Sequence, residues 1–309
     1  MLASRTYRIS FVLLALALLC ALLLNISSGS VSIPFFDVVS LLWGKTPEIV
    51  SWEYIVWEYR VPKAFTSILV GAGLSLSGLL MQTLFRNPLA GPFVLGISSG
   101  ASLGAALLLM GTSFLAGYTA FGFLGDVSLA IAASVGSFLV LLVVMIVAQR
   151  VKDTMALLII GLMFGSITSA IVSVLAYFSS AENLQRFIFW SFGSVGNLSM
   201  NQLLLLGGIV LLGVMLSIYS IKSLNAFLLG EHYAQSLGVS LNKSRLIIII
   251  ATGVLAGGIT AFAGPIAFVG LAVPHLTRQI FDTMEHKVLI PAVMPVSYTH
   301  LRAHETVLD

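Results

Sequence analysis

The sequence predicts an all-α fold, a polytopic bundle of transmembrane helices, from its composition and from the spacing of its apolar runs. Of the 309 residues, 58% are hydrophobic and only 9% are charged, whereas soluble domains carry about 25% charged residues. Apolar runs recur along the whole chain and are separated by polar loops. Together these observations exclude a soluble globular domain.

About eight apolar runs approach the roughly 20 residues that a membrane helix needs. Charged residues, prolines or polar turns bound each run. The last one contains Pro265 and Pro274, which predict a kinked or partly re-entrant span whose freed carbonyls are satisfied by neighbouring helices. The expected spans are 9–24, 64–84, 93–111, 127–148, 155–178, 201–219, 246–262 and 264–280.

The first run has two interpretations. Arg5 and Arg8 precede it and small residues follow it, a pattern also found in secretory signal peptides. The many later spans favour an uncleaved first helix. With a cytoplasmic N-terminus, the inner loops hold ten basic residues and the outer loops four, and basic residues prefer the cytoplasmic side. We therefore expect a multi-pass protein whose N-terminus is cytoplasmic.

Several function classes find no support in the sequence. The net charge of +3 is spread over loops, which argues against nucleic acid as a partner. Cys20 lies inside an apolar run, and His275 has no second ligand at metal-binding spacing. Gly44-Lys45-Thr46 mimics the end of a P-loop, but Val39 stands where a glycine is required. We expect no cofactor, no metal and no catalytic chemistry.

Two features within the spans and loops predict local structure. Gly96, Gly100 and Gly104 lie four residues apart, a small-residue stripe that lets helices approach closely, and we interpret it as a packing feature. The aromatic stretch 186–192 is expected to form a short helix at the membrane surface.

The longest polar interruption, residues 220–245, is predicted to lie in the cytoplasm because it carries Lys222, Lys243 and Arg245. Its apolar residues are spaced as in a short amphipathic helix, and its glycines stand where such helices end or turn. It is either an interfacial helix resting on lipid or a docking surface for a soluble partner. The candidate residues are Gly230, Glu231, Ala234, Leu237 and Gly238.

The C-terminal residues depart from the membrane pattern. KVLIPAVM, from Lys287, opens another apolar run, but the sequence turns polar after about nine residues, too soon to cross a bilayer. The tail resembles translated sequencing-adapter read-through. We therefore expect a transmembrane permease domain over 1–294, truncated at its C-terminus, and a non-native tail over 295–309.

Five motifs in order carry a family resemblance. They are WEYRVPK from Trp57, QTLFRNPLAGP from Gln82, LGISSGA from Leu95, LGEHYAQSLGV from Leu229 and AGPIAFVGLAVPHLTR from Ala263. Over about residues 10–294 the chain resembles the FecCD-type permeases of ABC importers for iron-siderophores, haem and vitamin B12. The resemblance implies a type II ABC importer permease with ten spans, of which about eight are present here.

The same resemblance implies partners and roles. The partners are cytoplasmic ATP-binding subunits, an external substrate-binding protein and a second permease subunit, identical or related, in the bacterial cytoplasmic (inner) membrane. Residues 220–245 correspond to the loop that couples to the ATPase, and residues 186–192 to a helix at the outer mouth. Arg60 and Lys63 correspond to the pair that docks the binding protein, with simple interface anchoring as the alternative. Asp153, Thr154 and Met155 correspond to the inner gate.

We therefore expect a permease subunit that moves an iron-siderophore or similar metal chelate inward and hydrolyses nothing itself. A vitamin B12 or haem importer is the alternative within the family. An ion-coupled secondary transporter is the alternative from another class, but such proteins normally place ionisable groups near the bilayer midplane. Here the charged residues fall at span ends and in loops.

Overall fold

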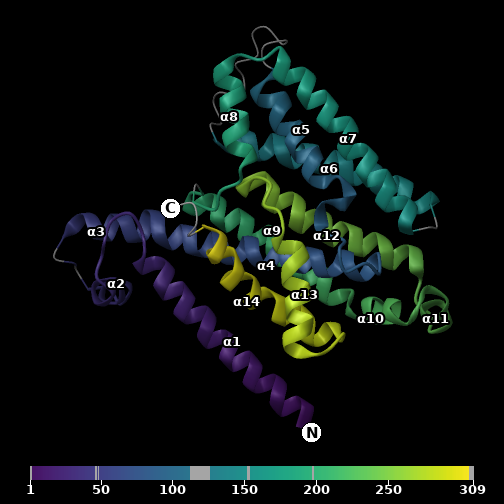
Figure 1. The fold of residues 1–309 in the computed structure, drawn as a ribbon, viewed down its shortest axis with the longest axis horizontal. Helices are drawn as coiled ribbons and strands as arrows, with labels where there is room; N and C mark the ends of the chain where they lie inside the picture. Colours follow the sequence, from purple (N-terminus) through teal and green to yellow (C-terminus); the bar gives the residue numbers. More distant parts are fainter. Residues whose placement is uncertain are drawn as a thin grey trace.

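The structure, a computed structural model, describes residues 2–45, 47, 49–111, 126–151, 154–196 and 198–305. Every regular element in these ranges is a helix, which confirms the predicted all-α class (Figure 1). The elements are α1 (Leu2–Ser27), α2 (Phe35–Leu42), α3 (Val50–Ile55), a π-helical turn (Val56–Arg60), α4 (Val61–Leu84), a 3₁₀ turn (Pro92–Leu95), α5 (Ile97–Leu109), α6 (Asp126–Arg150), α7 (Thr154–Tyr177), α8 (Ala181–Ser191), α9 (Met200–Tyr219), α10 (Ile221–Leu229), α11 (Glu231–Ser236), α12 (Leu241–Ala263), α13 (Val269–Phe281) and α14 (His286–Glu305).

Six of the eight expected spans are helices long and apolar enough to cross a membrane within the described residues. They are Tyr7–Ser27, Val50–Leu84, Val127–Arg150, Met155–Tyr177, Met200–Tyr219 and Leu241–Ala263. The second is longer than expected, because helical structure continues back from α4 through Arg60 to Val50.

The other two expected spans are shorter than the sequence suggested. Helices α5 and α13 have 13 residues each, about 20 Å at 1.5 Å per residue. The backbone explains both, since Gly96 adopts a left-handed conformation (φ 72°) just before α5. Residues 264–268 are not helical and end at Phe268 with φ 68°. The predicted break in the eighth span is therefore present.

Helices α4 and α12 form the centre of the bundle. Helix α4 contacts α9, α12, α13 and α14, and α12 also contacts α5 and α6. The closest approach is between Gly78 and Gly270, where a Cβ built on Gly78 would lie 1.6 Å from the carbonyl oxygen of Gly270. Only residues without side chains allow two helices to cross at this distance.

Helices α5 to α8 form a second group beside this centre (Figure 1). A Cβ on Gly100 would lie 2.6 Å from the carbonyl oxygen of Gly136, and one on Gly104 would lie 2.1 Å from that of Ala132. Gly100 and Gly104 are thus the α5 side of a close contact with α6, and Gly96 lies next to Gly161 of α7. This confirms the interpretation of the glycine stripe as a packing feature.

The non-helical segment 264–268 is held by the residues that follow α8. The backbone N–H of Ser194 donates to the carbonyl of Ala263 at 2.7 Å. A Cβ on Gly264 would lie 2.5 Å from the carbonyl oxygen of Trp190. Irregular backbone is tolerated in a membrane protein where other parts of the chain surround it and satisfy its polar groups.

Helix α14 crosses the boundary that the sequence suggested between residues 294 and 295. The helix runs from His286 to Glu305, and Val296, Ser297 and Tyr298 are buried in it. The division into 1–294 and 295–309 stays a prediction.

Candidate functional site

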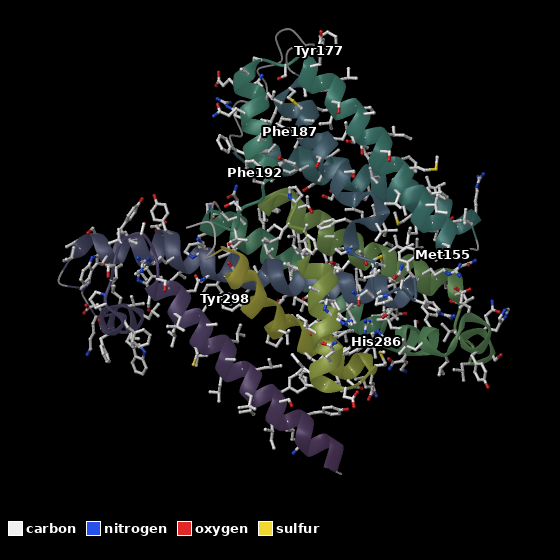
Figure 2. All side chains as sticks on the ribbon, viewed as in Figure 1. Met155, Tyr177, Phe187, Phe192, His286 and Tyr298 are labelled. Carbon is white, nitrogen blue, oxygen red and sulfur yellow. The ribbon has the colours of Figure 1, made fainter. Side chains whose placement is uncertain are left out.

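The candidate functional residues gather at two opposite ends of the bundle. Helix α9, which joins the α8 end to the α10 end, has 20 residues, about 30 Å. A Cβ on Gly196, just before α9, would lie 3.9 Å from Lys63, and one on Gly230, after α10, would lie 3.7 Å from Arg86. Helix α7 joins the same two ends in the opposite direction, from Met155 at the α11 end to Tyr177 at the α8 end (Figure 2).

We call residues 221–238, which contain α10 and α11, the coupling segment, after the role that the family resemblance predicts for them; that role stays a prediction. The prediction of a short amphipathic helix here is refined to two helices that meet at Gly230, where φ is 114°. Gly238 ends α11 with φ 81°, and its N–H donates to the carbonyl of Gln235 at 2.8 Å. Both glycines stand where L residues with side chains are disfavoured.

An ion pair fixes α11 to the bundle. Arg245 Nη2 lies 2.5 Å from Glu231 Oε1. The Arg245 side chain is 5% exposed, whereas that of Glu231 is 38% exposed. Removing the carboxylate would leave a buried guanidinium without this partner, which is costly. Glu231 therefore has a structural role in holding the coupling segment.

The outer face of the coupling segment is apolar. Leu229, Tyr233 and Leu237 are all more than 60% exposed. Ala234 points the other way and is fully buried in the main core. Of the predicted residues, Leu237 is thus available to a partner, while Ala234 supports the helix from beneath.

At the other end, Arg60 and Lys63 lie in different environments. Arg60 is 7% exposed. Its Nη1 donates to the carbonyls of Ile26 and Ser27 at 2.8 and 2.9 Å, and its Nη2 donates to that of Val31. Lys63 is half-buried one turn along. Arg60 therefore binds the C-terminal end of α1 in this structure, and the docking role of the pair stays a prediction.

The predicted inner gate is only partly within the described residues. Asp153 lies outside them, and so does the side chain of Thr154. Met155, in the first turn of α7, is 55% exposed and lies at the same end as α11 (Figure 2). The gate role stays a prediction.

A groove of about 470 Å³ runs between α5 and α7. Glycines leave room for it, and Ser99, Ser166 and Ser169 supply hydroxyl groups. Ser166 and Ser169 are exposed, although they belong to one of the apolar spans. The groove has the size of a small-molecule site, and its serines are scattered along two helices without a motif that marks them.

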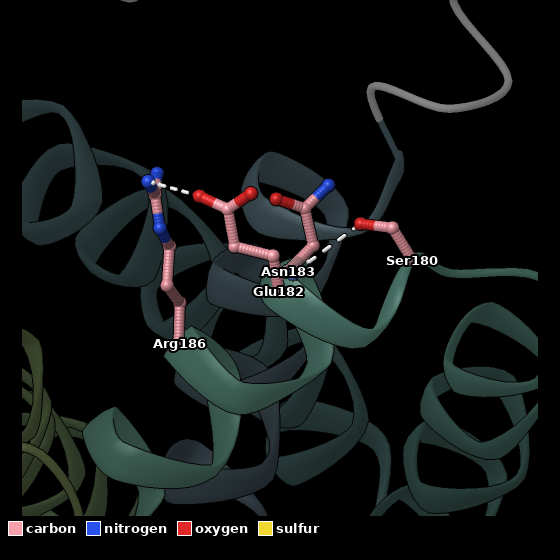
Figure 3. Close-up of polar contacts among 4 residues, drawn as sticks. All are labelled: Ser180, Glu182, Asn183 and Arg186. Atoms are coloured by element: carbon pink, nitrogen blue, oxygen red, sulfur yellow. Dashed lines mark hydrogen bonds and ion pairs between the residues drawn. The ribbon is translucent and has the colours of Figure 1, made fainter.

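Helix α8 confirms the short helix expected around 186–192, but it begins earlier, at Ala181. Ser180 caps it by accepting a hydrogen bond from the N–H of Asn183 at 3.4 Å (Figure 3). Arg186 pairs with Glu182 at 2.7 Å (Figure 3). This pair is exposed, so it adds only about 0.3–0.5 kcal/mol. Under α8 lies a second cavity of about 330 Å³ lined by Trp190 and Gln202 among others.

Sequence reasoning missed one buried polar residue. His286 lies outside all the expected spans, yet it is the first residue of α14 and is 1% exposed. It lies where the start of α14 contacts α10 (Figure 2). Its partners are distant in sequence, so no local pattern marks it.

Comparison with known families gives a match over nearly the whole chain. A profile of the FecCD transport family matches residues 16–308. The chain is 35% identical over 283 residues to the vitamin B12 import system permease protein BtuC of Klebsiella pneumoniae subsp. pneumoniae, covering 91% of this chain and 79% of that protein. It is 36% identical over 240 residues to the protein of the same name from Salmonella typhi, covering 77% and 70%.

A solved structure has a similar fold. It is described as an inward-facing conformation of a metal-chelate type ABC transporter. The TM-score is 0.80 at 30% sequence identity, and the match covers 93% of this chain and 86% of the other.

Proposed function

The chain belongs to the FecCD transport family, and we propose that it is the permease subunit of an ABC importer for a bulky metal chelate. Its family and its apolar helices make it a multi-pass membrane transport protein. In the proposal, ATP-binding subunits on the cytoplasmic side drive alternating access, and this chain hydrolyses nothing itself. The N-terminus and the coupling segment face the cytoplasm.

This proposal rests mainly on the structure of the coupling segment. Two short helices, set by positive-φ glycines, present Leu229, Tyr233 and Leu237 to the outside while an ion pair fixes them to α12. A rigid apolar surface of this kind suits a helix-in-groove contact with a soluble partner. An interfacial helix on lipid needs no such fixation.

The transported chelate in this proposal is an iron-siderophore, with vitamin B12 or haem as the alternative. The names of the relatives favour vitamin B12, and the description of the structural neighbour favours a metal chelate in the wider sense. Uptake into liposomes of radiolabelled ferric siderophore and of cobalamin, each competed with the other, tests the two. Uptake of neither compound by an ATP-driven complex would contradict both.

We place the transport path along the α5–α7 groove. Its hydroxyl groups offer hydrogen bonds to a polar cargo at a surface that otherwise faces lipid. A second permease subunit seated against α7 would enclose it, which agrees with the exposed apolar residues Leu162, Met163 and Ile167 on the same helix. Cysteine at Ser169 should then react with a water-soluble thiol reagent, and cargo should slow that reaction.

The coupling segment is tested by Gly238→Val. No atom lies within 4 Å of a Cβ at Gly238, so only its φ of 81° resists the change, at a cost of about 1–3 kcal/mol. A shifted α11 should reduce transport per ATP hydrolysed in the reconstituted complex while the binding protein still docks. Gly91→Val is the matched control, since Gly91 is equally open but has an ordinary φ of −95°.

Normal coupling in Gly238→Val would remove the coupling role from this segment.

The energy source is tested separately. Uptake should require the ATP-binding subunit and survive an ionophore that collapses ion gradients. The opposite result would favour an ion-coupled secondary transporter.

A further inference from the structure

A chain of buried hydrogen bonds connects the coupling segment to the central helix α4 through His286. Asn225 Oδ1, on α10, accepts two hydrogen bonds from His286, from its backbone N–H at 3.1 Å and from Nδ1 at 2.7 Å. His286 Nε2 lies 2.9 Å from Thr83 Oγ1 on α4. Three helices that are far apart in sequence thus meet at one imidazole ring.

The donors and acceptors fit a neutral ring with one tautomer. An amide oxygen only accepts, so Nδ1 carries the hydrogen that bonds to Asn225. Nε2 is then an acceptor for the Thr83 hydroxyl. The Thr83 hydroxyl has one hydrogen and also lies 2.9 Å from the carbonyl of Leu79, so Nε2 and this carbonyl share a single donor. Asn225 also caps α14, because the first N–H groups of a helix have no partner within it.

The surroundings make this connection stiff. Thr83 and His286 are 2% and 1% exposed. The preceding residue of α4, Gln82, accepts a hydrogen bond from Arg278 Nη1 at 2.6 Å and donates to the carbonyl of Leu271 at 3.0 Å. Two consecutive residues of α4 therefore bind α13 and α14. If α10 moves, either these two residues of α4 move as well or a buried polar contact breaks. Breaking such a contact is costly.

We propose that His286 is a positioning residue for energy coupling: it transmits movement of α10 to α4 and α14 through Asn225 and Thr83. The inference rests on the proposed function, because it assigns a role to His286 only if the coupling segment receives a movement from the ATPase. Ser223, by contrast, joins α10 to Ser244 of α12 by a single hydrogen bond of 2.9 Å. This bond does not involve Asn225, His286 or Thr83.

Two substitutions of His286 each remove one of its two side-chain hydrogen bonds, one to Thr83 and the other to Asn225. In His286→Asn the side-chain amide can replace Nδ1 and keep Asn225, but it cannot reach Thr83. In His286→Gln the amide can replace Nε2 and keep Thr83, but it loses the Nδ1 contact. We expect each to lower the cargo transported per ATP hydrolysed by about fivefold, the factor that corresponds to one net hydrogen bond. Ser223→Ala removes a hydrogen bond of α10 that does not involve His286, so this variant should stay near the wild type.

The reconstituted complex separates the possible failures. A ratio within twofold of the wild type in either His286 variant would overturn the proposal. An equal loss in Ser223→Ala would overturn it too, because any loosening of α10 would then suffice. If the wild-type complex showed no ATP-driven transport, that result would instead contradict the proposed function.

A thermal double-mutant cycle on the purified chain tests the physical link even in that case. Asn225→Leu and Thr83→Val each remove one end. If both act through His286, their melting shifts should be clearly less than additive. Additive shifts would show two independent contacts and overturn the transmission chain.

Discussion

Helices α4 and α1 are both long enough and apolar enough to cross a membrane, but they lie in opposite environments. In the segment that ends with α4, 83% of the most apolar window is buried, whereas in Tyr7–Ser27 the value is 6%. The buried segment has the lowest mean hydropathy of the six candidate spans, and the exposed one shares the highest.

This difference shows that hydropathy does not report burial once a chain is in the membrane. Lipid tails are as apolar as leucine, so no hydrophobic gain draws one helix rather than another to the centre. Helix α4 is central because Gly71, Gly73 and Gly78 let neighbours approach and Ser75, Gln82 and Thr83 bond to them. Helix α1 offers leucines that lipid accommodates equally well.

The largest effect expected from this comparison is at Gly78. Gly78→Leu should prevent α4 and α13 from crossing, since even a Cβ would lie 1.6 Å from the backbone oxygen of Gly270. We expect no monodisperse protein by size-exclusion chromatography in detergent. Gly208→Leu is the control, because nothing lies within 4 Å of a Cβ at that position of α9. Equal behaviour of the two variants would refute the packing argument.

Leucine truncation gives the next largest difference. Leu79 of α4 is fully buried, whereas Leu16 of α1 is 54% exposed. Leu79→Ala should leave a cavity and cost about 2–5 kcal/mol, while Leu16→Ala should cost less than about 0.5 kcal/mol. Thermal unfolding in detergent measures both. A large shift for Leu16→Ala would mean that α1 is covered by protein rather than lipid.

How much of the fold and of the candidate site could be predicted from the sequence depends on how far apart in sequence the interacting residues are. Hydropathy located six spans, and the spacing of apolar residues and glycines predicted short helical structure in residues 221–238, since these signals are local. The shortness of α5 and α13 was missed because single backbone angles at Gly96 and Phe268 decide it. The partners of Arg60 and His286 are 34 and 61 residues away, and a single sequence carries no mark of such pairs.

The polar end of α4 gives a pH-dependent prediction. His286 lies outside the six candidate spans, and burial, with a smaller contribution from the charge of Arg278, lowers its pKa from 6.5 to about 4. Between these values the unfolded chain binds a proton that the folded chain does not. Stability is therefore full above pH 6.5 and is lost as the pH falls towards 4.

Between pH 7 and pH 5 this loss amounts to about 2 kcal/mol. The melting temperature of the wild type should fall over that interval by more than that of His286→Asn, which has no titrating ring at this position. The other titrating groups are common to both proteins and cancel in the difference. Parallel curves would mean that His286 titrates normally.

Arg60 joins the two compared helices, and its substitution should have a smaller effect on stability than that of Gly78 or Leu79. The guanidinium extends from the start of α4 to the last carbonyls of α1, which have no helical partner. Arg60→Met keeps much of the side-chain packing but leaves these carbonyls unsatisfied, at about 1–3 kcal/mol. We expect a lower melting temperature and faster proteolysis in the loop after α1. Lys63→Glu tests the proposed docking role separately, because reversing the charge should weaken association with the proposed binding protein if that protein presents acidic residues to this end of the bundle. If Arg60→Met weakened that association while the melting temperature stayed unchanged, the pair would act in docking and Arg60 would not be the anchor of α1.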